Sequence, residues 1–281
     1  MTERAGRVSV VVPTRNVVRT LAACLDSVLA QDHPDVELIV VDNDSDDGSF
    51  EVARARAQVA VRGGPERSAQ RNAGTELASG EWVMWVDSDM VLPPATVRLA
   101  LATALDAGAD AVSVPELSIG PGFWSDCRRL ERTCYLDDPA LYYPRLLRRS
   151  VLVGLGGFDA TMSGPEDVDL RRRLDLSGAR LAHSPAVHIL HDEGRLTLAG
   201  ILRKRVYYGA SLPAFAAVHP GALRAQGAGT AAAFVRHRRR LLAHPVLAAG
   251  IVVMRVAEAA AYGVGYALGR RRLRATTGAP A

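Results

Sequence analysis

The stretch EWVMWVDSDM, residues 81–90, places a run of five apolar residues directly before two aspartates. The run, WVMWV (82–86), has the length and composition of a strand buried on both faces of a sheet. Asp87 and Asp89 follow where that strand leaves the core, with only Ser88 between them. Two carboxylates this close repel each other unless a positive charge neutralises them, and a divalent cation bound through oxygen atoms does so.

Similar apolar runs alternate with helical patterns through the first half of the chain. This alternation predicts an α/β fold with parallel strands and crossover helices. The polar clusters PTRN (13–16), DNDSDDGS (42–49) and DSD (87–89) each follow one of the runs. Because α/β sheets bind ligands beyond the carboxyl ends of their strands, we expect the three clusters to line one edge. The expected strands are 8–12, 37–41, 58–61, 82–86 and 109–114.

Residues that favour helix starts precede several of the helical patterns. Thr20 and Ser49 are the expected caps of the first two helices. Pro65 stands where the first residue of the third helix is expected, a position that suits proline.

The overall composition is that of a soluble globular protein. The chain has 281 residues, enough for one large domain or two smaller ones, and 23% of them are charged. Nine of the 34 basic residues but only one of the 30 acidic residues fall within 236–281. A mildly acidic body therefore precedes a strongly basic tail, which favours an anionic partner for the tail, such as a membrane surface.

Cysteine usage and the N-terminus both favour the cytoplasm. Cys24, Cys127 and Cys134 are odd in number and lack metal-site spacing, so we expect reduced, packed thiols. The sequence MTERAGRVSVVVPT contains an apolar run of only about five residues and no cleavage-like site, so no signal peptide is expected.

A second candidate for anion binding is RGGPERSAQRNAG (62–74), which is glycine-rich and then helical. Arg71 on this helix either lies on a solvated face or meets the anionic oxygens or base edge of a nucleotide. The chain contains neither G-x-x-x-x-G-K nor a G-x-G-x-x-G after a strand, so it has no other recognisable phosphate cradle. The D-x-D pair itself also has a plainer explanation as a solvated turn.

Four segments in order resemble family-2 glycosyltransferases of the GT-A fold: SVVVPTRN, LIVVDNDSDDGS, RNAGTELASGEWVMWVDSD and GGFDATMSGPEDVDLRRRL. The resemblance covers residues 8–215 and implies a mixed sheet flanked by helices. It also implies a nucleotide-diphosphate sugar donor, a divalent metal ion (Mn or Mg) at the D-x-D, and hexosyl transfer to an acceptor hydroxyl. We expect a glycosyltransferase domain over 1–215, with a nucleotide-binding half (1–114) and an acceptor and base half (115–215), before a C-terminal helical apolar and basic extension (216–281).

The resemblance also assigns residues to the donor site. Asp89 is expected to bind the metal directly, and Asp87 to contact the metal or the donor ribose. Asp42 is expected to contact the base. The cluster DNDSDDGS departs from the commoner form DDGSTDGT, which leaves the base identity open. The remaining nucleotide-binding candidates are Pro13, Thr14, Asp44, Ser45 and Arg71.

In the second half, SGPEDVDL (163–170) places Glu166 and Asp167 at the start of a predicted helix, where the helix dipole stabilises acids. Stabilisation by the helix dipole would by itself account for the presence of two acids at this position, without any catalytic role. The resemblance assigns the general base to Asp167 and orientation of the acceptor to Glu166. It gives His191, with His188 in reserve, a place in the metal or diphosphate site. We expect inverting direct displacement, although the scaffold also serves retaining enzymes.

The basic run Arg203–Arg205 on a later predicted helix has two explanations. It is either a solvated helix face or part of a lid that closes over the donor diphosphate.

The most apolar long stretch is LLAHPVLAAGIVVMRVAEAAAYGVGYALG (241–269), between the basic clusters RHRRR (236–240) and RRRLR (270–274). Arg255 and Glu258 interrupt it and are spaced to pair on one helix face. We expect an interfacial helix or hairpin on anionic lipid, peripheral on the inner face of the cell membrane. The alternatives are a docked helical subdomain and a single spanning helix.

The leading functional hypothesis is therefore a metal-dependent glycosyltransferase at the cytoplasmic membrane face, with a lipid-linked or small-molecule acceptor. The alternatives are a soluble natural-product glycosyltransferase and a non-catalytic protein that binds nucleotide sugar or lipid. Nucleic acid is not an expected partner, because the basic residues flank an apolar helix without interleaved aromatic residues.

Overall fold

The computed structural model describes residues 6–277, and the side chains of all these except 224–226 and 273–277. It divides into two compact units. The first comprises the chain up to Leu117 together with Tyr142–Ala160 and Leu170–Asp192, and the second comprises Ser118–Leu141, Thr161–Asp169 and the chain from Glu193 onward. The domain boundary expected at residue 215 stays a prediction.

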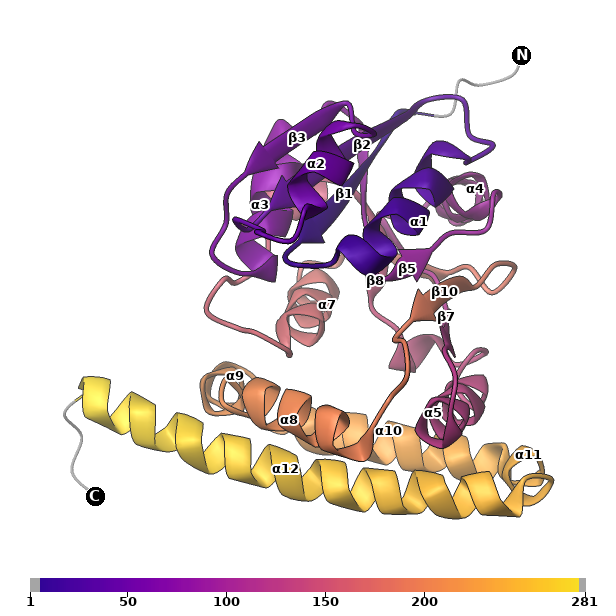
Figure 1. Cartoon of the computed structure of the whole chain (residues 1–281), viewed down its shortest axis with the longest axis vertical. Helices are drawn as coiled ribbons and strands as arrows, with labels where there is room; N and C mark the ends of the chain where they lie inside the picture. The colour runs from indigo at the N-terminus through magenta and orange to yellow at the C-terminus, as the bar shows by residue number, and fades with distance from the viewer. Residues whose placement is uncertain (1–5, 278–281) are drawn as a thin grey trace. The chain divides into compact units, whose positions relative to one another are not determined.

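A seven-stranded sheet forms the centre of the first unit (Figure 1). Its strand order is β3-β2-β1-β4-β8-β6-β9, and β8 runs antiparallel to both of its neighbours. The sheet is therefore mixed, and all five expected strands are present with their ends shifted by one or two residues. The strands are β1 (Val8–Thr14), β2 (Val36–Asp42), β3 (Val59–Arg62), β4 (Trp82–Trp85), β6 (Ala111–Ser113), β8 (Pro144–Arg148) and β9 (Leu181–His183).

The core of this unit lies on both faces of the sheet because successive strand residues point to opposite sides. Val8, Val10 and Val12 pack with α1 (Val18–Leu29) and α4 (Thr96–Ala107) on one face. Val11 and Ile39 contribute to the core of the other face. The helices α3 (Arg67–Leu77), α6 (Arg149–Gly154) and the later turns of α7 (Glu166–Leu176) cover that second face, while α2 (Ser49–Arg54) packs against α1.

Three expected helix starts were wrong by one to three residues. Helix α1 begins at Val18, so Thr20 lies inside its first turn. Ser49 is the first residue of α2, and the cap is Gly48 with φ 92°. Pro65 precedes the cap of α3, where the Glu66 side chain accepts a hydrogen bond from the Ala69 backbone N–H at 2.8 Å. The observed caps of α2 and α3 are Gly48 and Glu66, whereas the sequence rules for helix starts had selected Ser49 and Pro65.

Gly74 allows α3 to approach the sheet closely. A Cβ at this position would lie 2.3 Å from Cγ1 of Val11, which is fully buried in β1. We expect Gly74→Ala to lower the free energy of unfolding by about 1–3 kcal/mol, because Val11 has no free space to move into. Urea denaturation measures this loss. Gly63→Ala is the matched control, since nothing lies within 4 Å of a Cβ there; equal losses in both variants would contradict the packing argument.

A small three-stranded sheet, β5-β10-β7, accompanies the main one. Its strands are β5 (Met90–Val91), β7 (Glu116–Ile119) and β10 (Ile189–Asp192). Strand β5 follows the D-x-D directly, and it pairs antiparallel with β10 so that His191 lies opposite Met90. This pairing brings a histidine from the second half of the chain beside the two aspartates.

The second unit is helical. Helix α12 (Pro245–Thr277) contacts α5 (Phe123–Thr133), α8 (Leu198–Gly209), α9 (Leu212–Val218) and α11 (Arg238–Leu242), and Figure 1 shows α8 lying alongside it. The unit also contains α10 (Ala222–Arg236) and the short 3-10 helix η1 (Pro139–Leu141), which contact each other. The expected C-terminal helical extension is therefore present. The three cysteines of the chain are buried and unpaired, as expected.

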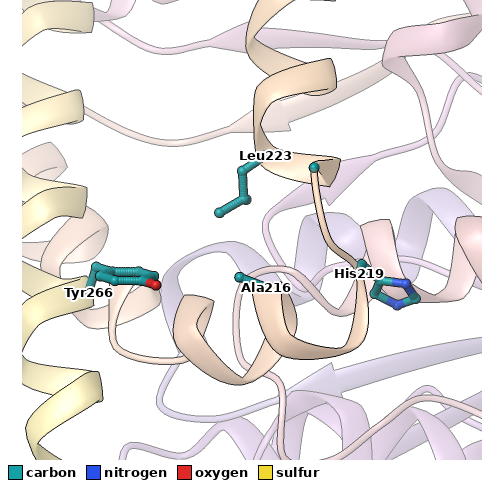
Figure 2. Close-up of a pocket in the computed structure, with 5 residues that line it drawn as sticks. Ala216, His219, Leu223 and Tyr266 are labelled. Carbon is teal, nitrogen blue, oxygen red and sulfur yellow. The ribbon is translucent and has the colours of Figure 1, made fainter.

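A cavity of about 440 Å³ opens in the helical unit between α9, α10 and α12. Its lining residues are Ala216, His219, Gly221, Leu223 and Tyr266, and Figure 2 shows Ala216 and Leu223 between Tyr266 and His219. The His219 Nε2 atom lies 2.7 Å from Oδ1 of Asp169, and both side chains are buried. This pair joins the first turns of α7 to the turn between α9 and α10.

Candidate active site

The ends of β1 and β2 form the first part of the candidate site. Thr14 and Asp42 are partners in the parallel register, and the Thr14 hydroxyl donates to Asp42 Oδ1 at 2.9 Å. The Ser45 backbone N–H and hydroxyl also donate to the Asp42 carboxylate, at 2.8 and 2.6 Å. Asp42 is fully buried, so its carboxylate fixes the loop that follows β2.

The other residues expected to bind nucleotide lie around this loop. Pro13 is buried in β1, whereas the Asp44 side chain is 80% exposed and lies 3.6 Å from Arg62. Asp44 has φ 45°, the left-handed conformation, which turns the chain sharply after β2. The nucleotide contacts expected of Pro13, Thr14, Asp42, Asp44 and Ser45 stay predictions.

Gln70, which was not selected from the sequence, joins the two strand ends to α3. Its side-chain amide donates to the carbonyl oxygens of Thr14 and Val41 at 2.8 and 2.6 Å. The next residue, Arg71, contacts Asp87. Gln70 and Arg71, which are consecutive in α3, therefore connect this helix both to the ends of β1 and β2 and to the D-x-D turn.

The D-x-D forms a tight turn between β4 and β5, in which the Met90 N–H donates to the Asp87 carbonyl at 2.9 Å. The Asp87 carboxylate faces two arginines: Arg71 Nη2 lies 2.7 Å from Oδ1 and Arg145 Nη1 lies 3.7 Å from Oδ2. Burial alone would raise the pKa of Asp87, but the two guanidinium groups hold it well below its ordinary value. The protein itself thus neutralises one of the two paired charges.

Arg71 is itself almost fully buried, with 1% of its side chain exposed, and its guanidinium also lies over the Phe158 ring. Its expected contact with nucleotide oxygens or a base edge stays a prediction. The contact that the structure shows for this guanidinium is the one with Asp87.

Asp89 is the more accessible aspartate, with 35% of its side chain exposed. Its Oδ2 lies 3.2 Å from His191 Nε2, and the other ring nitrogen of His191 lies 3.5 Å from Glu116 Oε2. Burial alone would lower the pKa of His191, but its hydrogen bonds and charge interactions with Asp89 and Glu116 raise it to about 9. Of the two histidines considered from the sequence, His191 is the one that contacts the D-x-D.

Glu116 and Arg145 were not selected from the sequence. Arg145 forms a close ion pair with Glu116 and also reaches Asp87, so the charges form a continuous chain from Asp87 through Arg145, Glu116 and His191 to Asp89. Each lies within or beside an apolar run, Glu116 in VPELSI and Arg145 in YPRLL. The sequence signal for both residues was a charged side chain within a run that is otherwise typical of a buried strand. A buried charge needs an opposite charge or hydrogen-bond partner, so each of these residues was a candidate for an ion pair.

The geometry of Asp89 and His191 fits an implied divalent cation in part. Two ligand atoms that are each about 2.1 Å from a cation, with a ligand–cation–ligand angle of about 90°, lie about 3 Å apart. The observed distance between Asp89 Oδ2 and His191 Nε2 is 3.2 Å, close to this value. Among the described residues, no group of three or more His, Cys, Asp or Glu side chains gathers in a metal-holding arrangement. Two protein ligands suit Mg²⁺ or Mn²⁺, whose remaining ligands are commonly substrate phosphate and water.

The proposed base residues lie at the start of α7, in the part of the helix that belongs to the helical unit. Glu166 is buried, and its carboxylate accepts a hydrogen bond from the Gly164 N–H at 2.5 Å. Asp167 is partly exposed. An accessible carboxylate beside a fixed one is compatible with the roles expected for the two residues, which stay predictions.

Comparison with known sequences gives a family. The sequence model described as "Glycosyl transferase family 2" matches residues 9–158. The chain is 29% identical to the pre-mycofactocin glycosyltransferase of Mycobacterium tuberculosis over 232 residues, which is 76% of this chain and 48% of that protein. It is 31% identical to glycosyltransferase GlyG of Streptococcus pneumoniae over 112 residues, 37% of each protein. The chain thus spans about half the length, or less, of these relatives.

Solved structures show the same fold. The Staphylococcus aureus TarS fragment 1–349 in complex with UDP-GlcNAc has a TM-score of 0.54 at 19% identity, over 73% of this chain and 66% of that one. The mannosyltransferase PcManGT of Pyrobaculum calidifontis in complex with GDP-Man and Mn²⁺ has a TM-score of 0.61 at 23% identity, over 95% and 81%. The match of the family model over more than half of the sequence, on a mixed GT-A sheet, shows that this chain belongs to glycosyl transferase family 2.

Proposed function

We propose that the protein transfers a hexosyl group from a nucleotide-diphosphate sugar to an acceptor hydroxyl. The observation that carries this proposal is the Asp89–His191 pair at the end of β4, joined through Glu116 and Arg145 to Asp87. Family membership supports it, as do the fold neighbours solved with UDP-GlcNAc and GDP-Man.

Asp89 and His191 would hold a Mn²⁺ or Mg²⁺ ion, with Asp87 contacting the ion or the donor ribose. Because a ligating imidazole is neutral, binding of the ion would release the proton that Asp89 and Glu116 stabilise on His191. When bound, such an ion supplies positive charge that stabilises the diphosphate leaving group. Arg71 and Arg145 keep Asp87 ionised and hold its carboxylate in one orientation. His191 is oriented in turn by Glu116, so a buried set of charges positions the two groups that face the donor.

Pro13, Thr14, Asp42, Asp44 and Ser45 would bind the nucleoside. Asp42 contributes by fixing the loop after β2 through Thr14 and Ser45, which keeps the surface beside the base rigid. Arg71 would add a contact to the nucleotide beside its contact with Asp87. This role would pre-organise the donor before transfer.

Asp167 would act as the general base. It would take the proton of the acceptor hydroxyl while that oxygen forms a bond to the anomeric carbon and the bond from this carbon to the diphosphate oxygen breaks. The attack comes from the face opposite the leaving group, so the configuration inverts. Glu166, fixed by the Gly164 N–H, would orient the acceptor.

We place this activity at the cytoplasmic face of the membrane, with the protein held there peripherally by its C-terminal helix. The support is the basic C-terminal sequence and the apolar composition of Pro245–Arg272, whose most apolar 18-residue window has a mean hydropathy of 1.5. A lipid-linked acceptor suits this location, and a small-molecule acceptor would indicate the soluble alternative.

Thermal unfolding with a panel of UDP and GDP sugars tests the donor and the metal together. We expect one donor to raise the Tm by several degrees in the presence of Mn²⁺ or Mg²⁺, because a ligand at a hundred times its Kd stabilises the native state by about 2.7 kcal/mol. EDTA should remove most of the shift. Failure of every donor to change the Tm with either ion would contradict the proposed donor class. Binding of a donor without any transfer would support the non-catalytic alternative.

A further inference from the structure

The helix α12 has two different faces. One face packs against α5 and α8 through Ile251, Met254 and Glu258, which are almost fully buried. On the other side, every exposed position from Val246 to Leu268 is Val, Leu, Ala or Gly. Its large side chains recur at helical spacing, are 41–70% exposed, and are Val246, Val252, Val253, Val256, Val264 and Leu268. We call this surface the valine face.

By length and composition, α12 qualifies as a membrane-spanning helix. The segment Pro245–Arg272 has 28 residues, and its most apolar 18-residue window has a mean hydropathy of 1.5. At 1.5 Å per residue it is about 42 Å long, more than the hydrocarbon thickness of a bilayer. Only 28% of its most apolar window is buried within the protein. Length and hydropathy alone therefore do not distinguish a helix that crosses a membrane from one that lies on it.

The buried face of α12 does distinguish them. Glu258 accepts hydrogen bonds from Arg128 of α5 and from Arg205 of α8, the latter at 2.9 Å. Arg255 reaches Glu131 of α5 and lies 3.4 Å from Glu258, which confirms the pairing expected from their spacing. If α12 left α5 and α8 to span a bilayer, Arg255 and Glu258 would lie near the middle of the hydrocarbon. The charged side chains that they contact on α5 and α8 would then be left buried without an opposite charge.

Close backbone contact also holds α12 to α8. A Cβ at Gly265 would lie 2.3 Å from the Val206 carbonyl oxygen, and one at Gly269 would lie 2.0 Å from that of Ala210. These glycines allow the two helices to pack at a distance that other residues would prevent. The docked position of α12 is therefore specified by both charge and shape.

Exposed arginines stand at both ends of the valine face: Arg238, Arg239 and Arg240 on α11, and Arg270, Arg271 and Arg272 at the end of α12. A helix that spans a bilayer would place one of these clusters on each side of the membrane. A helix that lies flat on one leaflet brings both to the same layer of anionic headgroups, where each arginine adds to binding. A second copy of the chain is disfavoured, because parallel and antiparallel packing along α12 would both bring arginine clusters together.

We propose that α12 stays docked on α5 and α8 and lies flat in the interface of an anionic membrane, with the valine face in the acyl boundary and both arginine clusters on headgroup phosphates. This inference rests on the proposed membrane location but not on the proposed chemistry. In this arrangement α12 does not cross the membrane. The protein binds instead through the amphipathic surface that α12 exposes in the folded state.

Vesicle binding tests the surface. The full chain should sediment with phosphatidylcholine vesicles containing phosphatidylglycerol, bind pure phosphatidylcholine weakly, and be released by 1 M NaCl. Val253→Glu/Val256→Glu should weaken binding by about tenfold or more without changing the Tm, because both side chains are exposed. Val153→Glu/Val218→Glu, with two valines that are 57% and 59% exposed elsewhere, is the matched control. Equal binding by the two double variants would overturn the proposal.

Spin labels test the orientation. Nitroxides on single cysteines introduced at positions 246, 256 and 268 should all report a shallow and similar depth in the bilayer. A deep label at 256 between two shallow ones would show a spanning helix and overturn the flat arrangement. If the protein is a dimer without vesicles and Val253→Glu/Val256→Glu makes it monomeric, the valine face is a subunit interface instead. No donor or acceptor enters these assays, so their failure would leave the proposed chemistry standing.

Discussion

Asp89→Asn is expected to lower kcat for sugar transfer by at least about a hundredfold and to remove its dependence on Mn²⁺ or Mg²⁺. Asp89 is the accessible carboxylate of the D-x-D and lies 3.2 Å from His191, whereas Asp87 is compensated by two arginines. Asparagine keeps the size of the side chain but not its charge. The variant should therefore fold normally and fail at the step that needs a neutralised diphosphate.

Metal titration distinguishes this loss from a general defect. Wild-type activity should fall to the level of Asp89→Asn when EDTA is added, while the variant itself should be insensitive to EDTA. Asp106→Asn, which makes the same change on the exposed side of α4, should keep wild-type activity and metal dependence. An Asp89→Asn variant that retained metal-stimulated transfer would remove Asp89 from the metal site.

Asp167→Asn is expected to reduce kcat by about 10²–10⁴-fold while leaving donor affinity unchanged. The amide cannot take the proton of the acceptor hydroxyl, but the nucleotide-side residues remain intact. Asp167 is partly exposed at the start of α7, so its replacement should not disturb packing. Calorimetric titration with the donor measures binding, and a transfer assay under saturating donor measures kcat.

Asp175→Asn is the control for the second prediction. Asp175 lies on the same helix, and its 54% exposed side chain pairs with Arg171. This variant removes the same charge from α7 at its other end and should transfer sugar at the wild-type rate. If Asp167→Asn also did so, the base would have to be a different residue.

Much of the α/β fold was predictable because its signal is local. The runs at 8–12, 37–41 and 82–86 are strands, as expected of short uninterrupted apolar runs that are followed by polar clusters. The polar clusters after them lie at strand ends for the same reason. The resemblance to the family implied a mixed sheet, but the place of the antiparallel strand β8 between β4 and β6 was not predicted, because neighbours in a sheet need not be neighbours in sequence.

The charges around the D-x-D show the limit of local inference. Asp87 and Asp89 were visible as a pair, and the expected compensating charge was a metal ion. The structure shows that Arg71 and Arg145 already neutralise Asp87, with Arg145 reaching it from a strand nearly sixty residues further along the chain. The structure places His191 beside the D-x-D, and its expected role at the metal or diphosphate stays a prediction. Its neighbour Glu116 could be identified only once β7 and β10 lay in one sheet.

The C-terminal helix shows the same division. Its apolar composition, its basic ends and the spacing of Arg255 and Glu258 are properties of the sequence, and they predict a helix; its anionic partner stays a proposal. Arg205 looked like part of a solvated or lid-forming basic run, yet it is bound to the buried Glu258.

By itself the sequence determined which segments are strands and helices and which residue types are available for chemistry, because burial and periodicity act over a few neighbouring residues. Only the tertiary structure decided which charges compensate each other and which face of α12 remains exposed, because a buried charge is stabilised by whichever opposite charge folding brings within a few ångströms.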